Sequence, residues 1–494
     1  MPTPLTTREF PYGIASGDLT SDSIVLWTRV APGTAEVAWW CEPVGVGEHL
    51  GGTRRAGTAV ADPMTGSVHA LVAGIAGEEQ YRYGFTAGAM TSPEGLFRTL
   101  PTDRPARFAV VCCAKFNSGF FNAYRALAGM DDIDFVLHLG DYIYEAAEVP
   151  VGKQTPGANI GRPMDPLGTC VSYADYDTRY REYRGDQDLL LLHSRHAMIA
   201  TVDDHELSDN AWSGGADEHD PARDGRWDDR KKAAMDAWQD WMPTLRHPLD
   251  GTDHVWQEIS LGEAGRILLC ETRLARTDPA APDGPHKTEL GPAQRDWIMS
   301  TLESPAPGWT FLAMPSMLAS VEAAASDPDA LFALRKLKLT DADAVETFHD
   351  LWGVFGHEKA ELLQAVRAAE RTIVLSGDVH FSAEHVAVPD PSGADGSGFI
   401  EWTATSITSP NLDDKMGWPR GAESRDYEAA MLKMLPDLRW CDLDSHGFLV
   451  VEAGPQSVSC QWWFVDTVVK ISDVAVMGHQ VVIPTTPVGE SQPA

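Results

Sequence analysis

Chemically reactive side chains follow directly after four strongly apolar runs of the sequence. One run is followed by Cys112 and Cys113. The other three are followed by Gly140-Asp-Tyr-Ile-Tyr-Glu145, Asp203-Asp-His-Glu206 and Ser376-Gly-Asp-Val-His380. Near-continuous apolar runs are typical of strands covered on both faces, and the carboxyl ends of strands in an open α/β sheet line one crevice. We therefore expect these distant clusters to converge in space.

The mixture of side chains in these clusters predicts bound metal ions. Several carboxylates in one crevice would repel each other and raise each other's pKa values, and cations remove that penalty. Carboxylate and amide oxygens suit hard cations such as calcium, magnesium or manganese. A phenolate with a thiolate and an imidazole suits a transition ion, iron first. The spacing of Asp141 and Tyr144 lets one loop supply a bridging carboxylate and a terminal phenolate.

The composition limits what the chain can bind. Its 494 residues contain 39 Lys and Arg against 72 Asp and Glu, a formal charge of −33. Such a surface repels nucleic acid and anionic lipid, so no nucleic-acid binding is expected, and phosphate esters can approach only where cations create a positive potential. No apolar run approaches the roughly 18 residues of a membrane-spanning helix. The seven Cys lack CxxC spacing, which argues against a disulfide framework and a thiolate zinc site.

The apolar pattern changes once along the chain. Residues 10–100 contain short β-rich runs separated by Gly, Pro and Asp, which is typical of an immunoglobulin-like sandwich. Beyond residue 106, apolar runs alternate with segments of helical period. We therefore expect an α/β fold, a layered β-sandwich flanked by helices, with an N-terminal all-β immunoglobulin-like domain. The segments expected to be helical are 119–129, 229–241 and 357–370, and residues 447–452 and 457–465 are expected to form a final β-hairpin.

Two boundaries divide the chain in this interpretation. Residues 100–105 contain two Pro and read as a linker. We expect an N-terminal β-sandwich domain at 1–102, a catalytic domain at 103–470 and a C-terminal tail at 471–494. The tail is rich in Pro, Thr and Ser, and we expect it to be partly loose.

The three motifs around Asp141, His205 and Asp378 resemble the metal-site motifs of PhoD-type alkaline phosphatases. That family is similar to the purple acid phosphatases and the wider metallophosphoesterases, and it includes phospholipase D-type phosphodiesterases. The resemblance extends over nearly the whole chain. Further stretches that carry it are Tyr12-Gly-Ile-Ala-Ser-Gly-Asp18, Glu271-Thr-Arg273, Leu290-Gly-Pro-Ala-Gln-Arg-Asp-Trp297, Thr405-Ser-Ile-Thr-Ser-Pro410 and Trp462-Trp-Phe-Val-Asp-Thr467.

The resemblance implies an iron(III) (Fe³⁺) site. Asp141 would bridge two metals, and Tyr144, Cys113 and His380 would complete the iron shell. The sequence departs from the family at Val111-Cys-Cys-Ala-Lys115, where a small residue and an amide usually flank the Cys ligand. Since successive strand residues face opposite sides, one thiol is expected to reach the site, and the alignment favours Cys113. Cys112 is expected to be a buried small hydrophobe.

The resemblance also implies a calcium (Ca²⁺) site and two groups that act on the substrate. Asp378 and Asn210 would hold calcium, with Asp203 or Asp204 contributing to its shell; Asp203 could instead orient a ligand. As catalytic groups, His205 would hydrogen-bond the phosphate or its leaving group, and Arg273 could neutralise a phosphoryl oxygen.

The leading hypothesis is a phosphomonoesterase that uses a metal-bound hydroxide as its nucleophile on a small phosphate ester. The alternatives are a phosphodiesterase of phospholipase D type at the same site, with a phospholipid among its substrates, and a non-catalytic binding protein. We expect a monomer. The N-terminus MPTPLTTREF has neither a basic region nor an apolar core, so no secretory signal is expected in this chain. Localisation stays open, because the family is usually exported, whereas a complete chain without a signal would be cytoplasmic.

Overall fold

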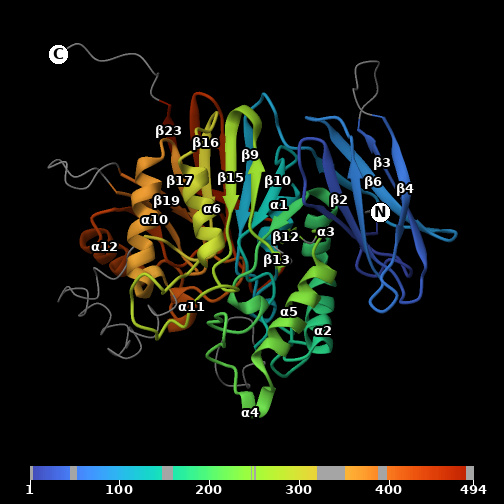
Figure 1. Cartoon of the computed structure of the whole chain (residues 1–494), viewed down its shortest axis with the longest axis horizontal. Helices are drawn as coiled ribbons and strands as arrows, with labels where there is room; N and C mark the ends of the chain where they lie inside the picture. The colour runs from blue at the N-terminus through green and yellow to red at the C-terminus, as the bar shows by residue number, and fades with distance from the viewer. Residues whose placement is uncertain are drawn as a thin grey trace.

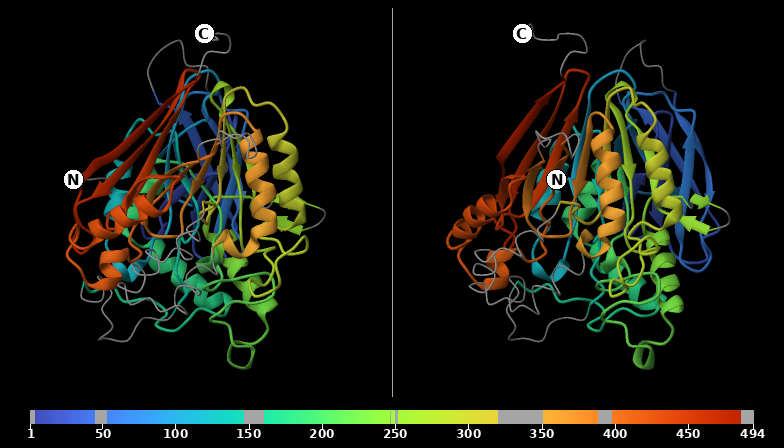
Figure 2. Two further views of the ribbon diagram at one scale, coloured as in Figure 1. Left: turned by 90° about the vertical axis from the view of Figure 1, so that its left-hand side faces the viewer. Right: turned by 60° about the vertical axis from the view of Figure 1, so that its left-hand side comes forward.

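Two large β-sheets pack face to face at the centre of the protein, and helices cover their outer faces (Figure 1). The structure, a computed structural model, describes residues 4–44, 53–146, 160–245, 247–249, 252–319, 351–387 and 398–485. Figure 2 shows the layers from two further sides. The expected layered α/β fold is confirmed.

The first sheet has nine strands, and parallel strands β9, β10 and β11 lie at its middle. Strands β21 and β22 extend it on one side as the expected hairpin. In spatial order the strands are β23 (Ala475–Pro484), β22 (Ser457–Val465), β21 (Gly447–Ala453), β9 (Ala106–Val111), β10 (Phe135–His138), β11 (Met198–Ala200), β1 (Ile14–Gly17), β2 (Ser23–Arg29) and β5 (Ser67–Ala73).

The second sheet has seven strands, of which β15, β16, β17 and β19 are parallel. Because their polypeptide directions agree, the residues that follow these strands emerge at one edge. In spatial order the strands are β14 (Gln257–Ser260), β15 (Gly265–Leu269), β16 (Trp309–Ala313), β17 (Thr372–Ser376), β19 (Ile400–Thr403), β18 (Ser382–Val386) and β20 (Leu438–Asp442).

Strand β9 shows why the central runs are apolar at every position. Phe108 and Val110 lie in the core between the two sheets, whereas Ala109 and Val111 pack against the helices on the outer face. Across the inter-sheet core, the ring of Phe108 meets Phe311 of β16 edge-on, with centroids 5.4 Å apart. Both faces of the strand are thus removed from water, which accounts for its continuous hydrophobicity.

Helices form the two outer layers. Those packed on the first sheet are α1 (Asn122–Ala128), α2 (Tyr173–Arg184), α3 (Gln187–Arg195) and α5 (Trp227–Trp241). Those near the second sheet are α6 (Pro292–Leu302), α10 (Gly356–Ala368) and α12 (Ser424–Met434). Helices α1, α5 and α10 correspond to the three helical segments expected from the sequence. Within the described ranges, every helix falls short of the length or apolar character needed to cross a bilayer.

The N-terminal region is all-β, as expected, but its strands belong to two sheets. Strands β1, β2 and β5 continue the nine-stranded sheet, and β1 pairs in parallel with β11 through Gly17 and Met198. The others form a small separate sheet: β3 (Glu36–Pro43), β4 (Arg55–Val60), β6 (Gln80–Ala87), β7 (Met90–Thr91) and β8 (Gly95–Arg98). Part of this region is therefore continuous with the central layer, and the boundary at residue 102 stays a prediction.

The expected loose tail contains a strand. Residues 475–484 form β23, which pairs antiparallel along the whole of β22. From Gly478 to Pro484 its residues alternate between exposed and half-buried, and Val476, Met477 and Val482 are exposed apolar residues. This strand was not predicted from the sequence, because the segment just beyond it is rich in Pro and Thr, a composition typical of loops. Residues 486–494 of the predicted tail lie outside the described residues.

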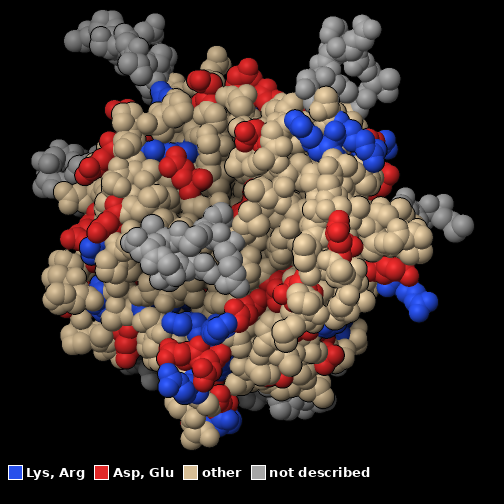
Figure 3. Space-filling model, turned by 45° about the vertical axis from the view of Figure 1, so that its right-hand side comes forward, with Lys and Arg blue, Asp and Glu red and all other residues tan. Residues whose placement is uncertain are grey.

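The surface agrees with the acidic composition. The net charge of −33 is not gathered in one patch on the face that Figure 3 shows, where acidic and basic side chains are interspersed.

Hydrogen bonds to Glu78 hold the linker that follows the N-terminal region. One carboxylate oxygen of Glu78 accepts hydrogen bonds from the backbone N–H of Thr102 and Asp103 (2.7 and 2.9 Å) and from the Thr102 hydroxyl (2.8 Å).

These hydrogen bonds, led by the one from Asp103, lower the pKa of Glu78 to about 2. We expect Glu78→Gln to lower the free energy of unfolding by about 1 kcal/mol at neutral pH, since the group is only partly buried. A carboxyl whose pKa falls on folding stabilises the protein above its unfolded value of 4.5, and this contribution disappears as the pH falls toward about 2.

Urea unfolding of the variant and the wild type should therefore differ at pH 7 and converge as the pH drops below about 4.5. Glu79→Gln, which changes the neighbouring carboxylate, serves as the control. A difference that stays constant with pH would contradict the assignment.

Candidate metal centre

Loops that follow β9, β10, β11 and β17 bring the predicted donor residues together. Cys113, Asp141 and His380 each offer a donor atom within 4.8 Å of the other two. Asp141, Asp204 and His205 form a second group with the same spacing. Asp141 belongs to both groups, so its carboxylate lies where a ligand that bridges two cations would have to lie.

Five of the eight predicted metal ligands have a left-handed backbone conformation. Cys113, Asp141, Asn210, Asp378 and His380 have φ angles of 59°, 56°, 55°, 69° and 59°, all in the left-handed region. This conformation costs roughly 1–2 kcal/mol for a residue with a Cβ, and it persists where the surrounding structure enforces it. Among the described residues other than glycine, three further positions have a positive φ: Asp18, Glu78 and Arg371. The strained positions are thus concentrated at the predicted ligands, which indicates a functional site.

A close approach of two loops sets the position of Asp141. Gly140 has φ 106°, and a Cβ at this position would lie 2.6 Å from the Cβ of Asp203. Only glycine fits there. The buried Glu206 then ties the loops together, because its carboxylate accepts hydrogen bonds from the backbone N–H groups of Asp141 (3.0 Å), Asp203 (2.7 Å) and Tyr142. Burial is the main cause that raises the pKa of Glu206 to about 8.

Tyr144 completes the first donor group. Its hydroxyl donates to Asp141 Oδ2 at 2.7 Å, lies 3.2 Å from His380 Nε2 and accepts a hydrogen bond from Ser409 Oγ at 2.6 Å. The side chain is buried, and burial together with the Asp141 and Cys113 charges raises the pKa of Tyr144 well above its usual value. A phenolate at this position would therefore need a cation to replace its proton.

His205 lies at the second group, and Glu145 holds its ring. The Nδ1 atom is 2.8 Å from Glu145 Oε2, Nε2 is 3.6 Å from Asp209 Oδ1, and the ring stands 4.0 Å from the ring of Tyr144. Burial alone would lower the pKa of His205, but the carboxylates of Asp204, Asp141 and Glu145 outweigh it and raise this pKa well above its usual value. A charged imidazole at this position can donate a proton.

Arg273 is completely buried behind the donor groups. Its Nε donates to Asp203 Oδ1, and its Nη2 lies 3.7 Å from Asp204 Oδ1 and 3.9 Å from Asp378 Oδ2. The guanidinium thus offsets the charge of three neighbouring carboxylates. Contact between Arg273 and a phosphoryl oxygen stays a prediction.

The remaining predicted calcium ligands, Asp203, Asp378 and Asn210, lie outside the two donor groups. Asp203 is engaged by Arg273 and belongs to neither donor group, and the same holds for Asp378. The backbone N–H of Asn210 donates to Asp204 Oδ2 at 2.7 Å, but its side-chain amide donates to Asp217 Oδ2 at 2.9 Å. The Asn210 side chain is therefore directed at another carboxylate in this structure, and its role as a ligand stays a prediction.

The donor sets fit the cations expected from the sequence. Burial raises the pKa of Asp141 well above its usual value, and the carboxylates of Asp204, Asp203 and Glu206 raise it further. A cation would relieve this energetic cost. Thiol, imidazole, phenol and carboxylate in the first group suit iron(III), whereas the carboxylates of the second suit a hard cation such as calcium.

Three contributors to this geometry were not predicted as site residues. Glu145 and Glu206 are the last residues of the motifs that contain Asp141 and Asp204. Their position in these motifs could have indicated that they belong to the site. Ser409 lies within the stretch Thr405–Pro410, which carried part of the family resemblance but no assigned chemistry.

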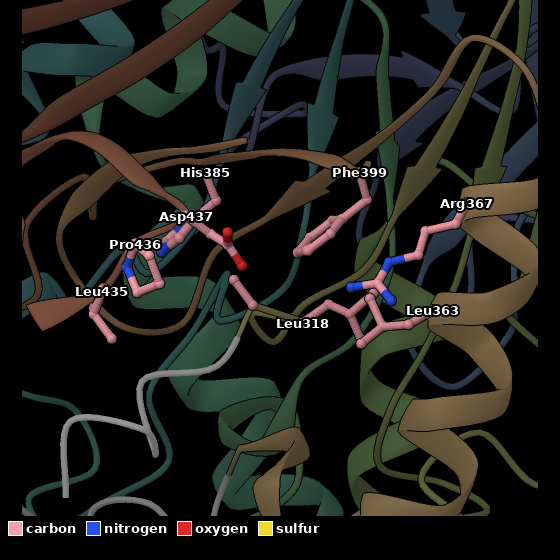
Figure 4. Close-up of a pocket in the computed structure, with 9 residues that line it drawn as sticks. Leu318, Leu363, Arg367, His385, Phe399, Leu435, Pro436 and Asp437 are labelled. Atoms are coloured by element: carbon pink, nitrogen blue, oxygen red, sulfur yellow. The ribbon is translucent and has the colours of Figure 1, made fainter. Parts of the chain in front are cut away.

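A separate pocket lies on the outer side of the second sheet (Figure 4). Leu363 and Arg367 of α10 line one side of it, and His385 of β18 and Asp437 line the other. No predicted site residue lines this pocket, so it is distinct from the candidate metal centre.

Glu206→Gln tests how the loops are held. The amide keeps the shape of the side chain but replaces one acceptor oxygen, so we expect metal affinity to fall by about 10–100-fold while the secondary structure stays intact. Equilibrium metal titration and circular dichroism measure the two effects. Glu358→Gln is the matched control, because Glu358 also accepts hydrogen bonds from loop backbone but lies on α10. Equal losses in both variants would contradict a role specific to the metal centre.

Comparison with known proteins shows the family to which the chain belongs. The family model of PhoD-like phosphatase matches residues 108–462, and that of the PhoD-like phosphatase N-terminal domain matches residues 2–101. Alkaline phosphatase D of Bacillus subtilis (strain 168) is 27% identical over 483 residues, which cover 92% of this chain and 76% of that protein. A solved structure of PhoD is similar with a TM-score of 0.80 and 25% identity, covering 97% of this chain and 91% of the other. The chain belongs to the PhoD-like phosphatase family and is a hydrolase of phosphatase type.

Proposed function

We propose that this phosphatase hydrolyses phosphate monoesters at the centre built around Asp141. The convergence of Cys113, Asp141, Tyr144 and His380 from loops far apart in the sequence is the observation that carries the proposal. Similarity to an alkaline phosphatase D supports it. In the net reaction, the oxygen of water forms a bond to phosphorus, the bond to the ester oxygen breaks, and the leaving oxygen takes up a proton.

The proposed cations are iron(III) and calcium. Cys113, Tyr144 and His380 would hold iron, and Asp141 would bridge to a calcium ion held by Asp204, with Asp378 and Asn210 contributing. When bound, such cations supply Lewis acidity that activates water and withdraws charge from the phosphoryl oxygens.

The chain's own residues support this chemistry in three ways. The fixed loops hold the carboxylate of Asp141 in place before substrate arrives, which avoids reorganisation during the reaction. His205, whose ring is held by Glu145, is placed to donate a proton to the leaving oxygen. Arg273 lowers the electrostatic cost of gathering several carboxylates beside a negatively charged substrate.

Asp141→Asn tests the bridging role. An amide keeps the shape but loses the negative charge, so we expect bound metal to be lost and kcat/KM for p-nitrophenyl phosphate to fall by about two orders of magnitude or more. Metal content by mass spectrometry and steady-state hydrolysis provide the two readouts. Asp296→Asn, at an exposed carboxylate on α6, is the control. A fully active, metal-loaded Asp141→Asn enzyme would rule the bridging role out.

Tyr144→Phe tests the identity of the first cation. If a phenolate binds iron(III), the wild-type protein has a visible charge-transfer absorption band, and this substitution should shift or remove the band while calcium content stays unchanged. Absorption spectra recorded with metal analysis of the same samples give the answer. A colourless wild-type protein that is fully active without iron would overturn the iron assignment.

A further inference from the structure

Two lysines that the metal and catalytic assignments do not use lie beside the donor groups. Lys115 comes two residues after Cys113, and Lys415 lies on α11 (Leu412–Met416). Across the described ranges, neither ammonium group forms an ion pair within 4 Å. Both charges therefore stay available to a ligand at the donor groups.

The position of Lys115 follows from its contact with Tyr144. Its Nζ lies 5.2 Å from the centre of the Tyr144 ring, whose hydroxyl touches both Asp141 and His380. The backbone at this position is fixed, because the carbonyl of Lys115 accepts hydrogen bonds from the Thr408 hydroxyl at 2.8 Å and from the N–H of Ser118 at 3.1 Å. Lys115 therefore covers one side of the first donor group.

Lys415 approaches the same donor group from another segment. Helix α11 follows Ser409 and Pro410, and these two residues hydrogen-bond Tyr144 and His380 respectively. Lys415 is exposed to solvent, and its charge lies within electrostatic reach of Asp378, Cys113 and His380. It also lies within reach of Lys115.

Asp141 acts electrostatically on Lys115 and Asp378 on Lys415, but neither carboxylate pairs with its lysine, so two positive charges border the same donor group and attract an anion. Cations in the donor groups would make this region more positive still. A phosphate monoester carries about two negative charges above pH 6, whereas a diester carries one. The second charge is the feature that a pair of compact, rotatable ammonium groups can detect.

We propose that Lys115 and Lys415 form an anion clamp that favours doubly charged phosphate monoesters over singly charged diesters. The clamp rests on the proposed hydrolysis of phosphate esters and specifies its substrate class. The lysines act mainly on binding, because they contact the phosphoryl group and not the leaving oxygen.

The test compares p-nitrophenyl phosphate with bis(p-nitrophenyl) phosphate, which release the same leaving group. Lys115→Met and Lys415→Met keep most of the apolar stem and remove the charge. We expect each variant to lose about tenfold in kcat/KM for the monoester, chiefly through KM, and less than threefold for the diester. Replacement of either lysine by Arg keeps the positive charge and should restore most of the preference for the monoester over the diester. Lys433→Met, at an exposed lysine of α12, is the control.

Binding of inorganic phosphate to the metal-loaded protein, measured by calorimetry, is the second readout. Its Kd should rise about tenfold in each Met variant and stay unchanged in the control. An unchanged monoester-to-diester ratio together with an unchanged phosphate Kd would overturn the clamp. If the wild type hydrolysed neither ester, the proposed function would fail, whereas the phosphate Kd would still decide for or against the clamp.

Discussion

The electrostatic cost of gathering carboxylates at one edge of two packed sheets governs the rest of this structure. Asp141 is buried beside Asp204, Asp203 and Glu206, and each of these neighbours opposes its ionisation. Arg273 and the charged His205 offset part of this cost from within the chain. Bound cations would relieve the remainder, and under the proposed function they would also attract a phosphate ester to so acidic a protein.

The fold supplies the rigidity that this arrangement requires. Parallel strands covered on both faces deliver their following loops to one edge, and the inter-sheet core around Phe108 and Phe311 holds the strands in register. The loops themselves are fixed by backbone contacts and not by apolar packing. Glu206 accepts hydrogen bonds from three backbone N–H groups. Gly140 allows two loops to touch where any side chain would separate them.

The sequence was sufficient to predict the layers and the convergence of Cys113, Asp141, Asp204, His205 and His380, because strand ends and motif order carry that information. The sequence was insufficient to predict the direction of individual side chains or the pairing of strands that lie far apart in the chain. The Asn210 amide turns toward Asp217, and no local pattern predicts that direction. Strands of the N-terminal region are divided between two sheets, because β1 pairs with β11 almost two hundred residues later.

That pairing has a consequence for how the chain is assembled. Strand β1 is synthesised long before β11, so the edge beside it stays open until β11 has followed, and β9 gains its outer neighbour only when β21 has been synthesised. At about 5–20 residues per second, β1 waits roughly ten seconds or more for its partner. The central sheet is therefore completed late, and unpaired strand edges are exposed to other nascent chains during that interval.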